Sequence, residues 1–148
     1  MKAPHGLVEI TAAFGHPTVR GFERANIVSF ELPYPLIYGT AMVRKSRAHK
    51  LVVPHFIEAL QAVKDQGLTE SATHYAGIYQ QRAIRGMPTH LSTHSWGIAI
   101  DLNPDENRLG TAGHMDPRII AVFEAAGFTW GGNFPRLDPM HFQYASGY

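Results

Sequence analysis

The stretch Leu91–Pro104 constrains this chain more than any other part of the sequence. From Gly97 to Asn103, apolar residues alternate with small or polar residues, which is the two-residue period of a half-buried β-strand. Asp101 therefore lies on the face opposite the apolar side chains. A tight turn at Trp96-Gly97 would fold His94 back over the start of this strand. We therefore expect an imidazole and a carboxylate to meet at one point, as they do in metal sites.

The C-terminal stretch Asp138–Tyr144 offers a third metal ligand. Met140, Phe142 and Tyr144 alternate with polar residues, so this stretch predicts a second strand with His141 on its polar face. The side chain of Asp138 is close enough to touch whatever His141 binds without being a ligand itself. Two neutral imidazoles and one carboxylate suit zinc, and three protein ligands leave a fourth position for water.

These two motifs together resemble those of a zinc peptidase family. Ser92-x-His94-x-x-Gly97-x-Ala99-x-Asp101 followed by Asp138-x-x-His141 is similar to the pattern of D-alanyl-D-alanine carboxypeptidases of the VanY-like group, vancomycin-resistance dipeptidases and phage L-alanyl-D-glutamate endolysins. These enzymes share a hedgehog-like peptidase fold. The segment Gly77–Gly86 is similar to the family's Tyr-x-x-Arg segment, and weaker similarity covers Phe128–Gly132 and Asn26–Pro35.

The resemblance implies a role for each of these polar residues. It implies that His94, Asp101 and His141 hold a zinc ion, which polarises the peptide carbonyl and lowers the pKa of its water. Asp138 stands where the family has Glu or Asp and is expected to act as general base and then as general acid.

Further residues complete the expected site. By the same resemblance, Arg82 would face the oxyanion of the tetrahedral intermediate, and Arg85 is the competitor for that role. Ser92 is expected to form a hydrogen bond beside the metal ligands or to the substrate. Trp96 is expected to form part of the pocket wall.

The expected substrate is the stem peptide of bacterial peptidoglycan. The short chain, the lack of an export signal and Asp in the base position favour an L-Ala-D-Glu endopeptidase of the endolysin type. A D-Ala-D-Ala carboxypeptidase is the alternative, because the shape of the loops that would distinguish a groove from a closed pocket is not written in the sequence.

Two other classes use similar ligands. Non-haem iron oxygenases also use two histidines and one carboxylate, but usually place one histidine and the acid two positions apart, whereas seven separate His94 from Asp101. A non-catalytic zinc-binding module is the second rival. Asp138 argues against it, because a structural site gains nothing from a free carboxylate beside its open position.

Length and composition set wider limits. The 148 residues suit one domain spanning 1–148, which we expect to be a monomer. The net charge of +1 argues against a strongly electrostatic nucleic-acid binder. Cysteine is absent, so nitrogen and oxygen must supply any metal ligands. We see no signal peptide and no membrane span, so the chain is expected to be cytoplasmic when synthesised and to reach the cell wall by a route such as phage-mediated release.

The order of expected elements indicates an α+β fold, with two or three helices on one face of a mainly antiparallel sheet. Helices are predicted from Pro54 to Gly67 and from Pro117, capped by Asp116, to Gly127. Further strands are predicted over Leu7–Ile10, Asn26–Leu32, Ile37–Arg44 and Thr73–Tyr79. Loops are predicted over Lys45–Lys50, Arg85–His90 and Pro104–Gly113.

Overall fold

A computed structural model describes all 148 residues of the chain. It confirms the α+β class and the antiparallel pairing, with four α-helices and three small sheets where two or three helices and one sheet were expected. The helices are α1 (Gly6–Phe14), α2 (Phe22–Asn26), α3 (Val53–Asp65) and α4 (Pro117–Ala125), with short 3-10 turns η1 (Thr69–Ala72), η2 (Thr93–Trp96) and η3 (Gly131–Asn133). The strands are β1 (Ile27–Tyr38), β2 (Ala41–His49), β3 (Ala83–Ile84), β4 (Met87–Leu91), β5 (Ala99–Asp101), β6 (Thr129–Trp130) and β7 (His141–Gln143).

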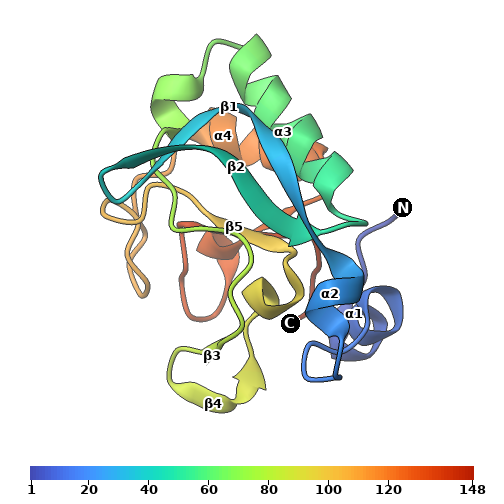
Figure 1. Cartoon of the computed structure of the whole chain (residues 1–148). Coiled ribbons are helices and arrows are strands. Elements are labelled where there is room, and N and C mark those ends of the chain that lie inside the picture. The colour runs from blue at the N-terminus through green and yellow to red at the C-terminus, as the bar shows by residue number, and fades with distance from the viewer.

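The elements form a layered body with one projecting hairpin (Figure 1). The long β1–β2 ribbon arches across the molecule, with α3 packed along β1 and α4 beside α3. The three-stranded sheet has the order β5-β7-β6 and lies beneath the ribbon. The β3–β4 hairpin projects from the end of the molecule away from α3 and α4. None of the four helices has the length and hydropathy that crossing a bilayer would require.

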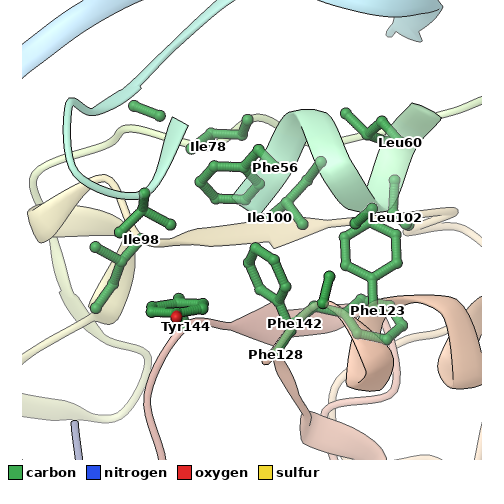
Figure 2. Close-up of a cluster of buried hydrophobic side chains, with 14 of the residues drawn as sticks. Phe56, Leu60, Ile78, Ile98, Ile100, Leu102, Phe123, Phe128, Phe142 and Tyr144 are labelled. Atoms are coloured by element: carbon green, nitrogen blue, oxygen red, sulfur yellow. The ribbon is translucent and has the colours of Figure 1, made fainter. Parts of the chain in front are cut away.

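The hydrophobic core is a cluster of 31 buried residues that joins these layers. Ile100 on β5 and Phe142 on β7 are directly opposite each other in the sheet, and both are fully buried. Figure 2 shows these side chains between Phe56 of α3 and Phe123 of α4, and the Phe123 and Phe142 rings lie 4.6 Å apart. Because successive residues of a strand point to opposite faces, the neighbours of Ile100 and Phe142 are directed away from this core.

The two predicted long helices are confirmed, with the expected signals at their ends. Pro54 lies in the first turn of α3, where its missing N–H costs nothing. Asp116 caps α4 by accepting a hydrogen bond of 2.9 Å from the backbone N–H of Arg118. Gly127, with φ of +98°, follows the end of α4, where a left-handed backbone favours glycine.

The strand predicted over Leu7–Ile10 is wrong, because these residues belong to helix α1. Ile10 and Phe14 are buried four positions apart, which is helical spacing, while Val8 is exposed. A period of two over only four residues could not outweigh that longer pattern.

The ends of the strands in the β1–β2 ribbon also differ from expectation. Pro33 and Pro35 were expected to stop the first strand, but β1 continues to Tyr38. Between the pairs Glu31–Lys45 and Leu36–Val43, β1 advances five residues and β2 only two, so the prolines lie in a bulge where the ladder is interrupted.

Three further segments depart from the predicted pattern. Lys45–Lys50 was expected to be a loop, but β2 runs through it to His49 as one strand of a two-stranded ribbon, whose charged residues face solvent. The predicted loop Arg85–His90 contains most of β4, whose residues are too exposed to show apolar alternation. The strand predicted over Thr73–Tyr79 is reduced to isolated bridges at His74 and Tyr75.

Candidate metal centre and active site

Pairing of β5 with β7 brings the two motifs together. Asp101 and His141 are directly opposite each other in the antiparallel register, next to the core pair Ile100 and Phe142. Alternation therefore places the carboxylate and the imidazole on the face away from the core. The Asp101 Oδ1 atom lies 3.0 Å from His141 Nδ1.

The turn η2 brings His94 to the same point. Ser92 caps this 3-10 turn by accepting a hydrogen bond from the backbone N–H of His94, and Gly97 ends it with φ of +71°. A Cβ atom at Gly97 would lie 2.7 Å from the backbone nitrogen of His49, so only glycine fits here. The chain then enters β5, and His94 Nε2 lies 3.1 Å from Asp101 Oδ2.

The three side chains form a buried cluster with the composition of a metal site. One ligand atom from each of His94, Asp101 and His141 lies within 4.8 Å of the others, and all three residues are buried. His94 Nε2 is the one buried side-chain nitrogen or oxygen in the chain without a hydrogen-bond partner. A buried polar atom that nothing satisfies is costly, so the donor set fits a bound cation.

A second buried histidine, His49, shows how a histidine with a purely structural role is bonded. His49 is as buried as His94, yet its Nε2–H donates to the Phe14 carbonyl at 3.0 Å and its Nδ1 accepts from the Leu51 N–H at 3.2 Å. His94 Nδ1 donates to the Ile78 carbonyl at 2.8 Å, which leaves the lone pair of Nε2 directed at Asp101. Both ring nitrogens of His49 have hydrogen-bond partners, as in a structural core histidine, whereas His94 keeps one nitrogen free to bind a metal.

The neighbouring carboxylate and imidazoles of the cluster shift one another's pKa values. Burial raises the pKa of Asp101, but the neighbouring imidazoles of His94 and His141 outweigh burial and hold that pKa far below its ordinary value. Burial lowers the pKa of His141, but the neighbouring Asp101 carboxylate outweighs burial, so the pKa is raised. Asp101 is therefore ionised, as a metal ligand must be.

Asp138 lies beside the cluster of His94, Asp101 and His141 and is not part of it. Its backbone N–H donates to the Gly131 carbonyl at 2.9 Å, and its own carbonyl accepts from the His141 N–H at 3.0 Å, so a tight turn connects it to the ligand. Its side chain lines the cavity, where burial raises its pKa. No hydrogen bond occupies the carboxylate, which leaves it free to exchange a proton.

Arg82 lies at the same opening. Its Nη2 atom is 3.9 Å from Asp101 Oδ2, and 37% of the side chain is exposed. The fully buried hydroxyl of Ser95 holds the backbone of this residue, since it accepts from the Arg82 N–H at 2.9 Å and donates to the Arg82 carbonyl at 2.8 Å. The backbone that carries the guanidinium is therefore fixed at the edge of the cluster.

A cavity of about 760 Å³ lies beside the cluster and reaches it at His141, the one residue of the three that lines the cavity. The β3–β4 hairpin contributes Ile84, Arg85 and Met87 to one side, and the loop 133–136 contributes Phe134 and Arg136 to another. The two sides approach each other, because a Cβ atom at the hairpin glycine Gly86 would lie 3.3 Å from Arg136 Nη1. The floor carries Asp138, His141 and Gln143.

The two residues expected to contact substrate have different surroundings. Ser92 lines the cavity but is 5% exposed, and its hydroxyl accepts from the backbone of His94. Trp96 does not line the cavity. It is fully buried, and its indole N–H donates to the Gly15 carbonyl at 2.7 Å. The expectation of a pocket wall at Trp96 is therefore wrong, because η2 turns this side chain into the core.

Three polar residues that support the site were missed from the sequence. Thr93 and Gln143 contact His141, and Ser95 holds Arg82. Gln143 could have been found, because it follows His141 by two positions and must share its face of β7. Ser95 gave no signal, since its partner lies 13 positions away across a turn.

The site and the fold define the class of protein. Two histidines and one aspartate around a metal position, a free carboxylate and an open cavity make the chain a metallopeptidase. Residues 85–144 match the family model described as D-alanyl-D-alanine carboxypeptidase, which confirms the resemblance to that zinc peptidase family. The match spans the three residues of the cluster and Asp138, while Arg82 lies outside it. No curated protein and no solved structure matches the chain.

Proposed function

We propose that this chain is a zinc-dependent peptidase that hydrolyses a peptide bond in the stem peptide of bacterial peptidoglycan. The observation that carries the proposal is the convergence of His94, Asp101 and His141 next to a cavity that His141 and Asp138 line. Two imidazoles, one carboxylate and an open position suit zinc. A zinc ion held there supplies a Lewis acid for the scissile carbonyl and for the attacking water.

The residues of the chain then divide the proton and charge movements. Asp138 takes a proton from the attacking water and delivers it to the leaving amine, so one carboxylate serves first as base and then as acid. Arg82 places a positive charge at the cavity edge, where negative charge develops on the carbonyl oxygen. Ser92 and Ser95 contribute indirectly, because their hydrogen bonds fix the backbone positions of His94 and Arg82.

An L-Ala-D-Glu endopeptidase activity is the first candidate. The cavity volume of about 760 Å³ is in the upper part of the usual range of roughly 300–1,000 Å³ for small-molecule sites. This volume gives room for residues on both sides of the cleaved bond. Arg85 and Arg136 on its sides suit a peptide that carries several carboxylates. Such an enzyme would act at the cell wall, after release from the cell that makes it.

D-Ala-D-Ala carboxypeptidase activity is the second candidate, favoured by the description of the matched family. In that case Arg85 or Arg136 would hold the terminal carboxylate of the substrate.

Digestion of purified peptidoglycan, with mass spectrometry of the products, tests the two candidates. New N-terminal D-glutamate identifies the endopeptidase, and free D-alanine identifies the carboxypeptidase. Activity that is lost with a chelator and restored by zinc supports the metal. If the zinc-loaded chain cleaves neither bond, the proposal is wrong, and a non-catalytic zinc-binding module becomes the better description.

A further inference from the structure

We propose that Gln143 is a positioning residue that fixes the tautomer and orientation of His141, so that Nδ1 of this imidazole binds the metal. The inference rests on the metal site of the proposed function. It concerns a buried amide that touches neither the metal position nor Asp101.

The orientation of the Gln143 amide is determined by its surroundings. Its nitrogen Nε2 lies 3.0 Å from the Tyr148 carbonyl and 3.4 Å from the Ala145 carbonyl. Carbonyl oxygens only accept hydrogen bonds, so the NH₂ group must point toward them. The amide oxygen Oε1 therefore points the other way, toward His141 and Thr93. Gln143 is 2% exposed, so water does not compete for these contacts.

The amide oxygen in turn determines where the proton of His141 lies. Gln143 Oε1 is 2.8 Å from His141 Nε2 and also accepts from the Thr93 hydroxyl at 3.0 Å. An unprotonated Nε2 would set two lone pairs against each other at this distance. Nε2 must therefore carry the proton and donate it to Gln143. In the neutral imidazole this leaves the lone pair on Nδ1, which lies 3.0 Å from Asp101 Oδ1, and two acceptors this close require a shared cation such as the bound metal.

The two ligand histidines are thus prepared by different means. His94 is held by a backbone carbonyl, that of Ile78, which no side-chain substitution can remove. His141 depends on side chains, with Thr93 Oγ1 at 3.2 Å from Nε2 as a weaker second contact. Partners of this kind orient metal-binding histidines and typically change metal affinity by roughly 10–100-fold when they are lost. His141 is therefore the ligand whose preparation can be tested by mutation.

The test compares zinc affinity, measured by competition with a chromogenic chelator, in the whole chain and two variants of Gln143. Gln143→Met keeps the size of the side chain but removes the acceptor, and we expect zinc affinity to fall about 10–100-fold. Gln143→Glu keeps an acceptor for the Nε2–H of His141 but loses the donors to the Tyr148 and Ala145 carbonyls, so its thermal unfolding midpoint should fall while its zinc affinity stays within a few-fold of wild type. Imidazole ¹⁵N shifts of the zinc-loaded wild type should show a protonated Nε2 at His141.

A matched control separates positioning from general destabilisation. Asn107 is another fully buried amide, which donates to the Asn103 carbonyl and accepts from the His114 N–H, away from the metal ligands. Asn107→Leu should lower the thermal unfolding midpoint without changing zinc affinity. If Gln143→Met does not fold, Thr93→Val is the second variant, with a smaller expected loss of affinity.

The outcomes are distinguishable. Wild-type zinc affinity in Gln143→Met, or a His141 bound through Nε2, would overturn this inference and leave the peptidase proposal intact. A wild-type chain that binds no zinc would overturn the metal assignment on which both proposals rest. Equal losses of zinc affinity in Gln143→Met and Asn107→Leu would overturn the positioning role of Gln143, because both losses would then reflect lower stability alone.

Discussion

The metal centre and the sides of the cavity above it are built in opposite ways. His94, Asp101 and His141 come from η2 and two paired strands, are buried, and are held by further hydrogen bonds. The sides consist of the two-stranded β3–β4 hairpin and the loop 133–136, in which Arg85 and Arg136 are exposed. The hairpin projects from the body of the molecule (Figure 1), whereas Asp101 and His141 are next to the buried core pair Ile100 and Phe142 in their strands.

This difference indicates that the buried cluster determines the chemistry and that the sides of the cavity select the substrate. Close packing and satisfied hydrogen bonds leave the buried ligands one arrangement. Exposed hairpins and loops tolerate changes in length and sequence, so a scaffold can keep its reaction while its specificity changes. Substitutions at the centre should therefore abolish catalysis, and substitutions on the sides should change substrate binding.

The largest effect is expected from Asp101→Asn at the centre. The substitution keeps the shape of the side chain but removes the ligand charge that the two histidines stabilise. A catalytic metal contributes several kcal/mol to the transition state, so peptidase activity should fall at least ~10³-fold. Bound zinc, measured by elemental analysis after dialysis, should be lost as well. The control is Asp105→Asn, which changes an exposed aspartate on a loop and should retain both peptidase activity and bound zinc.

Asp138→Asn should separate metal binding from proton transfer. The amide cannot act as a base, so the rate constant kcat should fall by roughly 10²–10⁴-fold. Bound zinc should remain near one ion per chain, because Asp138 is outside the ligand cluster. Full activity in this variant would remove Asp138 from the mechanism and indicate that another group accepts the proton. Loss of zinc would place it among the ligands.

The parts of the site that could be predicted from sequence are those set by short-range geometry. Alternation along a strand places Asp101 and His141 on a polar face whatever the rest of the chain does. Caps and prolines likewise indicated where α3 and α4 begin, because these signals act within one helical turn. The ligand cluster follows once two such strands pair in register.

The parts that could not be predicted depend on distant partners. Nothing near Trp96 in sequence reveals that Gly15, 81 positions away, accepts its indole N–H and draws the side chain into the core. The loop predicted at Lys45–Lys50 is a strand because β1 pairs with it, and its own residues carry no apolar alternation. The bulge at Pro33 and Pro35 is likewise a property of the pair of strands.

A moderate effect is expected when one cavity arginine is removed. An exposed ion pair contributes about 0.2–1 kcal/mol, so Arg85→Ala or Arg136→Ala should raise KM for stem-peptide substrates by roughly 1.5–5-fold. The rate constant kcat should be unchanged, and added salt should reduce the difference between variant and wild type. Arg24→Ala, on the exposed surface of α2, is the matched control. A fall in kcat for Arg85→Ala would instead give that residue the role proposed for Arg82.

The smallest effect on peptidase activity is expected at His49, a buried histidine outside the ligand cluster, where a substitution should change stability instead. It tests whether satisfaction of both ring nitrogens distinguishes this residue from His94. Burial lowers the pKa of His49, although the Phe14 carbonyl opposes the shift. Because the unfolded chain titrates at the ordinary value of about 6.5, the neutral folded form contributes its full stability above that pH. That stability is lost as pH falls below 6.5 toward the folded pKa.

His49→Gln should therefore lower the unfolding free energy by about 1–3 kcal/mol at neutral pH, since it removes satisfied buried hydrogen bonds. Urea titrations with a chelator present, between pH 7.5 and 5, should show the gap from wild type narrowing toward low pH. Wild type alone must release a proton from position 49 to fold. His90→Gln, on exposed β4, should change neither the unfolding free energy nor its dependence on pH. A gap that stays constant with pH would mean that His49 folds without losing its proton, and the contrast with His94 would then rest on hydrogen bonding alone.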